Sequence, residues 1–490
     1  MLPARRRHLR PAPRDHCAPA RGHKLLAPLR RAPREVWRFS PLGAYDSRRP
    51  VGLAKRRAQD NGLAVLIERH NRELCSKLHS QLHTMTPAEF EALEDLSMTI
   101  PQPIHPFPAR MAPHLALEEV QRLETGSVVL DPMMGSGTVV RFAAQYGHHA
   151  SGRDVDPLAV LMTKVWTTPT NPRRLREAAQ ELVDAAWQLP ADTLVLPWID
   201  DDPETRAFVG YWFAYPQQDA LRRLSYLLAT LDTAESDALR LALSKIIITK
   251  DQGASLARDV SHSRPHRAFT RNSYLVYDGF LQAAHRLARR LEREPPPGNT
   301  DPALGDARAL DLADSSVDAV ITSPPYLNAI DYLRGHRLAL VWLGHQLGAL
   351  RTIRAESIGA ERAPRPEADT ELAAWVMRCM KLDGLLPQRE HRMVERYILD
   401  LSAMLSEIHR VLRPGGRAVF VIGNSSIRGV FVKNSLAIST LAKRLGLRQL
   451  GCWERVLPPS RRYLPPPTAN INTDLDRRMR TEIILKYVRE

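Results

Sequence analysis

Cysteines and long apolar runs are scarce in this sequence of 490 residues. The four cysteines are scattered and lack the paired spacing of a zinc site: Cys17, Cys75, Cys379 and Cys452. A disulfide framework and a bound metal are therefore disfavoured, and a reducing, cytoplasmic location is expected. No apolar run reaches the roughly 20 residues of a membrane-spanning helix, so we expect no membrane partner. The length suffices for one large domain with insertions, or for two domains.

The charge of the chain is unevenly distributed. A net charge of +15 suits a polyanionic partner, but residues 1–50 alone hold 13 Lys and Arg against 3 Asp and Glu. Residues 1–55 are rich in Arg, Pro and Ala and have little apolar periodicity, which predicts a disordered basic tail. Residues 56–100 are predicted to form a helical segment, because leucines recur there at three- and four-residue steps.

A proline-containing motif organises the rest of the chain. The apolar residues 317–321 predict a buried strand, which is followed by Ser323-Pro324-Pro325-Tyr326. Two consecutive prolines fix φ and remove two backbone donors, so carbonyls are left available. Ligands bind at the carboxyl ends of strands in open α/β sheets. We expect a flat base to stack on Tyr326 while its amino group donates to Ser323 and to the Pro324 carbonyl; an ordinary proline turn is the alternative.

A glycine-containing loop is the second motif. Residues 128–130 predict a short strand and residues 139–146 a helix, and the loop between them begins at an acid: Asp131-Pro132-Met133-Met134-Gly135-Ser136-Gly137-Thr138. Glycines let the backbone turn tightly and approach a ligand. The spacing is not Gly-x-Gly-x-x-Gly and no Gly-Lys-Ser/Thr follows, which disfavours dinucleotide and P-loop sites.

An acidic residue follows at the distance expected for ribose binding. Asp154 ends the second predicted strand about 20 residues after the glycines, where a carboxylate can accept hydrogen bonds from ribose hydroxyls. Asp156 is the alternative, although it could instead cap the next helix.

Residues 167–300 interrupt the alternation of strands and helices. Helices are predicted over about 219–231, 236–247 and 273–293, and a basic loop over residues 255–267 suits phosphate contacts or simple solvation. This helical insertion is our candidate for target recognition. The alternation resumes at Asp306, and residues 350–390 are expected to be an irregular excursion. Further on, a Pro-Gly-Gly turn at 414–416 is expected to precede a strand over 418–422.

The ordered motifs over residues 104–326 resemble those of class I S-adenosylmethionine-dependent DNA amino-methyltransferases. The resemblance implies an α/β, Rossmann-like fold with a mostly parallel sheet and helices on both faces, its cofactor half in residues 101–166 and its catalytic half in 301–490. It implies S-adenosyl-L-methionine as cofactor, bound by these residues: Phe107, Arg110, Asp131, Gly135, Ser136, Gly137, Thr138, Asp154 and Asp306. Phe107 and Arg110 would enclose its methionine end, and Asp306 would accept from its adenine amino group. Met133 departs from the family, where many members carry Phe.

The resemblance also assigns the catalytic role to the residues of one motif: Ser323, Pro324, Pro325 and Tyr326. It implies double-stranded DNA as partner, with a restriction or other defence-system protein as a further possible partner. Ser before Pro-Pro-Tyr favours the N4 amine of cytosine; the N6 amine of adenine is the alternative. No Pro-Cys motif is present, so carbon-5 methylation of cytosine is disfavoured. An RNA guanine-N2 methyltransferase, a glutamine-amide methyltransferase and a binding protein without activity are the other readings.

Overall fold

The computed structural model describes these residues: 82–84, 100–107, 110–190, 194–259, 265–327, 331–360, 369–457 and 481–490. The chain divides into the units Met1–Asn61 and Gly62–Glu490, and all described residues belong to the second. The predicted tail, 1–55, and nearly all of the predicted helical segment, 56–100, lie outside the described residues. No described helix is long and apolar enough to cross a membrane.

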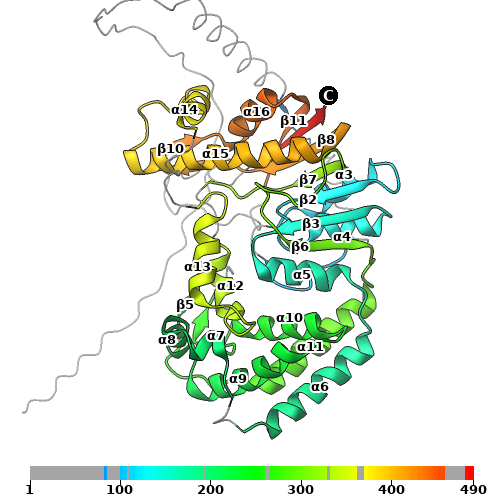
Figure 1. Ribbon diagram of the computed structural model, residues 1–490, viewed down its shortest axis with the longest axis vertical. Helices are drawn as coiled ribbons and strands as arrows, with labels where there is room; N and C mark the ends of the chain where they lie inside the picture. The colour runs from blue at the N-terminus through cyan, green and yellow to red at the C-terminus, as the bar shows by residue number, and fades with distance from the viewer. Residues whose placement is uncertain are drawn as a thin grey trace, which may run out of the picture. The chain divides into compact units, whose positions relative to one another are not determined.

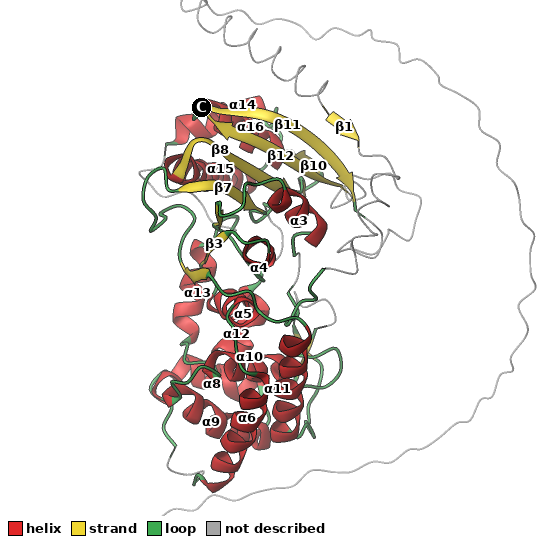
Figure 2. Cartoon of the chain, turned by 90° about the vertical axis from the view of Figure 1, so that its right-hand side faces the viewer, coloured by secondary structure: helices red, strands yellow, loops and turns green. Residues whose placement is uncertain are grey.

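An eight-stranded sheet forms the centre of the second unit (Figures 1 and 2). Its strands are β1 (Leu82–Thr84), β2 (Val128–Asp131), β3 (His149–Asp154), β6 (Thr300–Leu304), β7 (Val317–Thr322), β8 (Leu412–Ile422), β11 (Leu447–Val456) and β12 (Thr481–Arg489). They lie in the order β1-β11-β12-β8-β7-β2-β3-β6, and every pair is parallel except the two that β12 makes with β8 and β11. The predicted α/β, Rossmann-like fold with a mostly parallel sheet is confirmed.

The centre of this sheet is covered on both faces, which explains the mostly apolar sequence of β7 and of the second half of β8. On one face Leu130 and Phe420 pack with α14 (Thr370–Cys379), α15 (Gln388–Val411) and α16 (Asn434–Arg444). On the other face their neighbours Val129 and Val421 pack with α3 (Pro113–Gln121) and α4 (Thr138–Gln145). In the register of β2 and β7, Leu130 pairs with Val320, so the two strands end at the same edge.

The residues between β3 and β6 form a helical layer. Its helices are α5 (Pro157–Thr167), α6 (Pro172–Gln188), α7 (Pro197–Asp200), α8 (Pro203–Trp212), α9 (Tyr215–Thr230), α10 (Ser236–Ile247) and α11 (Val276–Arg293). The three helices predicted in the insertion correspond to α9, α10 and α11. Leu158, Met162 and Trp166 of α5 share one hydrophobic core with the helices of the insertion, while Val160 packs toward the sheet. Helix α5 therefore joins the insertion to the sheet.

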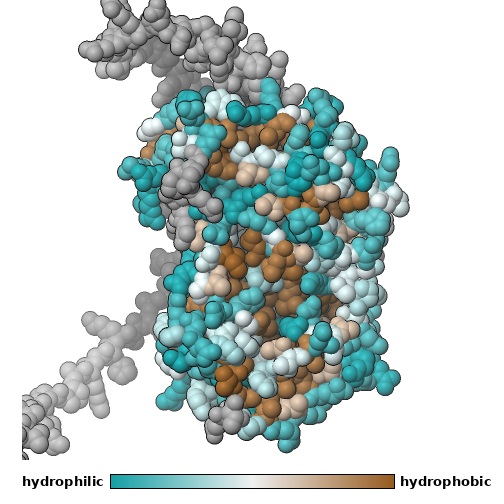
Figure 3. Space-filling view, in the orientation of Figure 1, coloured by the Kyte–Doolittle hydropathy of each residue, from teal (hydrophilic) through white to brown (hydrophobic). Residues whose placement is uncertain are grey.

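On the face shown in Figure 3, hydrophobic residues gather in patches over the helices below the sheet.

Two helices from residues 301–490 pack into the core that α5 shares with the insertion. They are α12 (Leu333–Leu340) and α13 (Leu347–Glu356). Two short antiparallel pairs complete the described elements: β4 (Ala257–Arg258) with β5 (His266–Arg267), and β9 (Ser425–Ile427) with β10 (Val430–Val432). Part of the predicted basic loop, residues 260–264, lies outside the described residues.

One expectation was wrong. Within the range expected to be irregular, residues 350–356 and 370–379 are helical, because α13 and α14 bury apolar faces that include Leu350, Ala373 and Val376, while residues 361–368 lie outside the described residues. The strand expected over 418–422 is confirmed as part of β8, which already begins at Leu412. Residues 413–416 bulge out of β8 opposite Asp318, with Gly415 at a φ of 78°.

Candidate active site

The carboxyl ends of β2 and β7 are joined by a buried hydrogen bond. The Thr322 hydroxyl donates to Asp131 Oδ1 at 2.7 Å, and the Met133 amide donates to the same oxygen at 3.2 Å. Burial, with a smaller contribution from the Asp154 charge, raises the pKa of Asp131 to about 7. Asp131 is therefore placed to hold the two motif-bearing strand ends together.

The glycine loop folds back on Asp154. Asp154 Oδ2 accepts from the Gly135 amide at 2.9 Å, and Oδ1 accepts from the Asp156 amide at 2.9 Å. Burial and the neighbouring Asp156 charge raise the pKa of Asp154 to about 6. Both loop glycines have positive φ, 51° for Gly135 and 81° for Gly137. Because Asp154 fixes this backbone conformation, it shapes the loop; its contact with a ribose remains a prediction.

The loop leaves two buried hydroxyls free for a ligand. Ser136 Oγ and Thr138 Oγ1 are buried and have no hydrogen-bond partner within the described part of the chain. Buried hydroxyls are normally satisfied, so such atoms indicate a bound group. The loop residues therefore fit a polar ligand at the start of α4.

An aromatic cluster lies over the glycine loop. The Phe107 ring lies so close to Gly135 that a Cβ there would be 3.0 Å from the Phe107 Cε1 atom. The same ring stacks on Tyr332, with centroids 5.0 Å apart, and contacts His336 at 5.7 Å. Phe107 is thus placed beside the loop as predicted. Arg110 lies just before α3 with its Nη1 atom buried, and its cofactor contact remains a prediction.

Asp156 caps α5 and also pairs with a histidine. Its Oδ1 accepts from the Leu158 amide at 2.9 Å, so the capping alternative for Asp156 is confirmed. Its Oδ2 lies 2.5 Å from His336 Nδ1, and both side chains are buried. Sequence reasoning missed Tyr332 and His336. Their only signal was a position just after the proline motif.

The Ser-Pro-Pro-Tyr turn is anchored from three sides. The Ser323 hydroxyl donates to the Val421 carbonyl at 2.9 Å. The Pro325 carbonyl accepts from the Tyr397 hydroxyl at 3.1 Å, and Ser425 donates to the Leu327 carbonyl at 2.7 Å. A hydroxyl has one proton and two lone pairs, so Ser323 keeps acceptor capacity after this donation.

Tyr326 is packed rather than freely exposed. Its hydroxyl donates to Glu482 Oε1 at 3.3 Å, and a Cβ added to Gly423 would lie 2.7 Å from its Cε2 atom. Burial, aided by the Glu482 charge, raises the pKa of Tyr326 well above its ordinary value. The ring is therefore held in one orientation as a neutral phenol, and its stacking on a base remains a prediction.

Asp306 lies where predicted, in the turn after β6, but its carboxylate is already engaged. Arg308 donates to it through Nη2 at 2.7 Å and Nε at 3.0 Å, and also contacts Asp400 at 2.6 Å. The Asp-x-Arg spacing could have signalled this pairing. A contact between Asp306 and an adenine amine remains a prediction and would use its remaining acceptor capacity.

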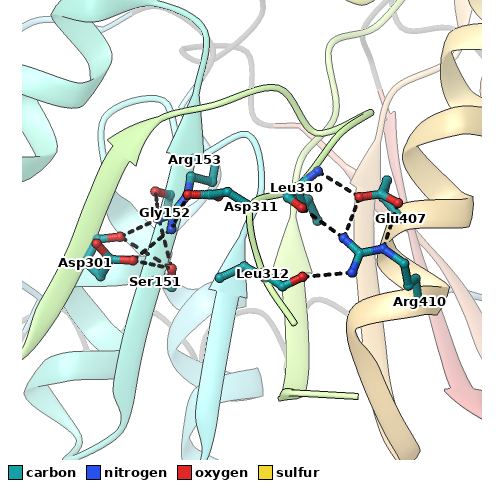
Figure 4. A network of polar contacts seen from close by, with 9 residues as sticks. All are labelled: Ser151, Gly152, Arg153, Asp301, Leu310, Asp311, Leu312, Glu407 and Arg410. Atoms are coloured by element: carbon teal, nitrogen blue, oxygen red, sulfur yellow. Dashed lines mark hydrogen bonds and ion pairs between the residues drawn. The ribbon is translucent and has the colours of Figure 1, made fainter. Parts of the chain in front are cut away.

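Two arginines fix the segment that follows this turn (Figure 4). Arg153 of β3 donates to Asp311 at 2.7 Å and to Asp301 at 2.9 Å. Arg410 of α15 donates to the Leu310 and Leu312 carbonyls at 2.9 and 2.8 Å. The segment is thereby held between β3 and α15.

Known proteins similar to this chain include several methyltransferases, although no family model matches it. Over 398 residues it is 22% identical to the type II methyltransferase M.MvaI of Kocuria varians, covering 73% of this chain and 84% of that relative. It is 25% identical over 146 residues to M.AvaI of Nostoc sp., covering 26% and 30% of the two chains. It is 22% identical over 167 residues to M.BsoBI of Geobacillus stearothermophilus, covering 28% and 33%.

Two solved structures with some likeness are also methyltransferases. One is the TehB-like SAM-dependent methyltransferase of Corynebacterium glutamicum, 10% identical, covering 86% of this chain and all of that one, with a TM-score of 0.26. The other is a SAM-dependent methyltransferase of Methanosarcina mazei, 9% identical, covering 75% and 95%, with a TM-score of 0.27. These scores are too low to carry an argument, so the fold assignment rests on the strand order and the packing of the helices.

Proposed function

We propose that this chain is a site-specific DNA methyltransferase that transfers a methyl group from S-adenosylmethionine to the N4 amine of cytosine. The observation that carries the proposal is the position of Ser323, which keeps acceptor capacity after its donation to Val421, at the same sheet edge as the glycine loop. The curated relatives, all type II methyltransferases, support the reaction class.

The polar atoms and the accessible backbone of the glycine loop suit S-adenosylmethionine. Ser136 Oγ and Thr138 Oγ1 offer unused polar groups, and Gly135 and Gly137 leave the backbone accessible. Phe107 would cover the bound molecule from the side of the preceding segment. When bound, the cofactor supplies an electrophilic methyl group on a sulfonium.

The chain's own contribution is to prepare the amine. An exocyclic amine conjugated with a base ring is a poor nucleophile, because its lone pair is delocalised. Hydrogen bonds from this amine to Ser323 Oγ and the Pro324 carbonyl would favour a pyramidal nitrogen with a free lone pair. Holding the two reactants in line supplies much of the remaining rate enhancement.

Tyr326 would hold a base rotated out of the duplex, a step that costs a few kcal/mol of stacking. Its ring is already fixed by Gly423 and Glu482, so little additional ordering would be required on binding. A covalent cysteine mechanism is disfavoured for the described cysteines. Cys379 is the last residue of α14 and belongs to neither motif, and burial raises the pKa of Cys452 to about 11.

The choice of base rests on Ser323 alone, since Asp is more common at this position in adenine N6 enzymes of the family that the sequence resembles. Adenine N6 is the second candidate, and guanine N2 in RNA the third. Purified protein with radiolabelled S-adenosylmethionine, offered duplex DNA and tRNA separately, tests the acceptor. Transfer to DNA that is lost in Ser323→Ala is expected. Transfer to tRNA alone would contradict the proposal.

A further inference from the structure

A concave, cationic groove lies between α6 and α11 of the helical insertion. It is lined by Arg176 of α6 and by Gln282, His285, Arg286 and Arg289 of α11. The four α11 residues follow the steps of three and four that place side chains along one helix face, with neighbouring Cβ atoms about 5–6 Å apart. The groove therefore presents a row of cationic and polar groups to solvent.

The positive charge of this groove is largely uncompensated. Arg176 has a carboxylate partner, Glu292, at 2.5 Å. Across the ranges that the structure describes, neither Arg286 nor Arg289 has a carboxylate within 4.0 Å. The first turn of α6 differs, since Arg173 and Arg174 are paired with glutamates. Uncompensated guanidinium groups in a concavity are the feature that requires explanation.

Lys245 of α10 lies within electrostatic reach of the groove residue Arg286. Lys245 Nζ donates to the Ile104 carbonyl at 2.9 Å, three residues before the ring of Phe107 that covers the glycine loop. Burial and the nearby charge of Arg286 lower the pKa of Lys245 to about 8. A second concavity is lined in part by His105, Lys245 and His336.

We propose that the α6–α11 groove binds backbone phosphates of the DNA duplex that carries the target base. The inference rests on the proposed function and assigns a surface of the insertion to its partner. Guanidinium groups bind phosphate oxygens in a fork and remain charged at any physiological pH. Such contacts set the position of the protein on the duplex but carry no sequence information, so the bases must be read by other residues.

The test compares two double variants with the same change in net charge. Arg286→Gln with Arg289→Gln removes the groove cations, and Arg173→Gln with Arg174→Gln removes two paired arginines from the same layer. Fluorescence anisotropy with a labelled duplex, over a series of salt concentrations, gives the slope of log Kobs against log[salt]. Each phosphate contact contributes about 0.9 to that slope. We expect the slope measured for the groove variant to be less steep than the wild-type slope by about 1.8. The control variant should keep the wild-type slope.

A third variant separates charge from shape. Arg286→Lys with Arg289→Lys keeps both positive charges and should restore most of the slope. Equal slope changes in the groove variant and the control would contradict the inference, because a general loss of charge would then explain both. Unfolding temperature and cofactor affinity should be the same in all variants, since both arginines are exposed.

Methylation at saturating DNA distinguishes failure of the groove from failure of the proposed function. If the wild-type protein methylates DNA but the groove variant shows no change in the salt-dependence slope, the groove inference alone is overturned. A slope change in a protein that never methylates DNA overturns the proposed function and leaves the groove as a DNA-binding surface.

Discussion

The Ser323 hydroxyl donates to the Val421 carbonyl at 2.9 Å, which links the end of β7 to β8 at the candidate active site. The bond uses the only proton of the hydroxyl, so toward any further group the oxygen can act only as an acceptor. A proline turn without this bond could present the hydroxyl either as donor or as acceptor. The orientation fits the acceptor role that we propose for Ser323.

Replacing Ser323 by Ala should reduce methyl transfer at least about 100-fold, in the range seen when one preorganised hydrogen bond is removed from an active site. Cofactor affinity should stay nearly unchanged, because Ser323 is not part of the glycine loop. Steady-state transfer and isothermal titration with S-adenosylmethionine measure the two quantities. Ser316→Ala is the matched control, since its hydroxyl donates to the Ala313 carbonyl just before β7. Loss of cofactor binding in the Ser323 variant would show that the motif is structural.

Gly423→Ala should displace Tyr326. The new Cβ would lie 2.7 Å from Cε2 of the ring, closer than real contacts allow, so the ring must shift. We expect the kcat for DNA to fall while cofactor affinity is kept. Gly348→Ala in α13 is the control, because nothing lies within 4 Å of the added atom. If kcat is unaltered in Gly423→Ala, the orientation of Tyr326 does not contribute to the reaction.

Gly135→Ala should weaken cofactor binding. The residue has a φ of 51°, which costs an alanine about 1–2 kcal/mol, and its Cβ would press on the Phe107 ring at 3.0 Å. We expect at least a tenfold rise in the Kd for S-adenosylmethionine, measured by titration. Gly210→Ala in α8, which has open space around it, should bind normally. Normal binding by the Gly135 variant would exclude the loop as the cofactor site.

Asp131 should make the protein less stable as the pH rises. Because burial raises its pKa from 3.8 to about 7, the folded state holds a proton that the unfolded state has already released above pH 4. That contribution to stability is complete below about pH 4 and is lost as the pH rises through 7. Asp131→Asn removes the titration, so its unfolding temperature should fall less between pH 5 and pH 8 than that of the wild type. Asp184→Asn, an exposed change on α6, should follow the wild type. Equal pH dependence in all three proteins would contradict the assignment.

The fold and the positions of both motifs could be predicted because their signals are local. The apolar residues 317–321, the glycines at 135 and 137 and the acid at 154 each lie within one strand or turn. The contacts that complete the site join residues far apart in the chain. Tyr326 meets Glu482 across 156 residues, and Asp156 meets His336 across 180. Pairings at such separations depend on tertiary packing and leave no periodic pattern.

One contact in the site was missed for a different reason. Asp306 is expected to accept from a ligand, and the structure shows that Arg308, two residues later, also engages its carboxylate. That signal was local and could have been used. The irregular structure predicted over 350–390 was wrong for α13 and α14. Charged residues alternate there with the apolar residues of each buried face, so the helical periodicity was not recognised.

The measurement that tests the central proposal most directly is mass spectrometry of nucleosides from DNA co-expressed with this protein and, in parallel, with its Ser323→Ala variant. The account predicts N4-methylcytosine in the first sample and none in the second. N6-methyladenine with the same dependence on Ser323 would keep the mechanism and correct the base. Unmodified DNA in both samples, from cells that contain folded protein, would contradict the proposal that this chain methylates DNA.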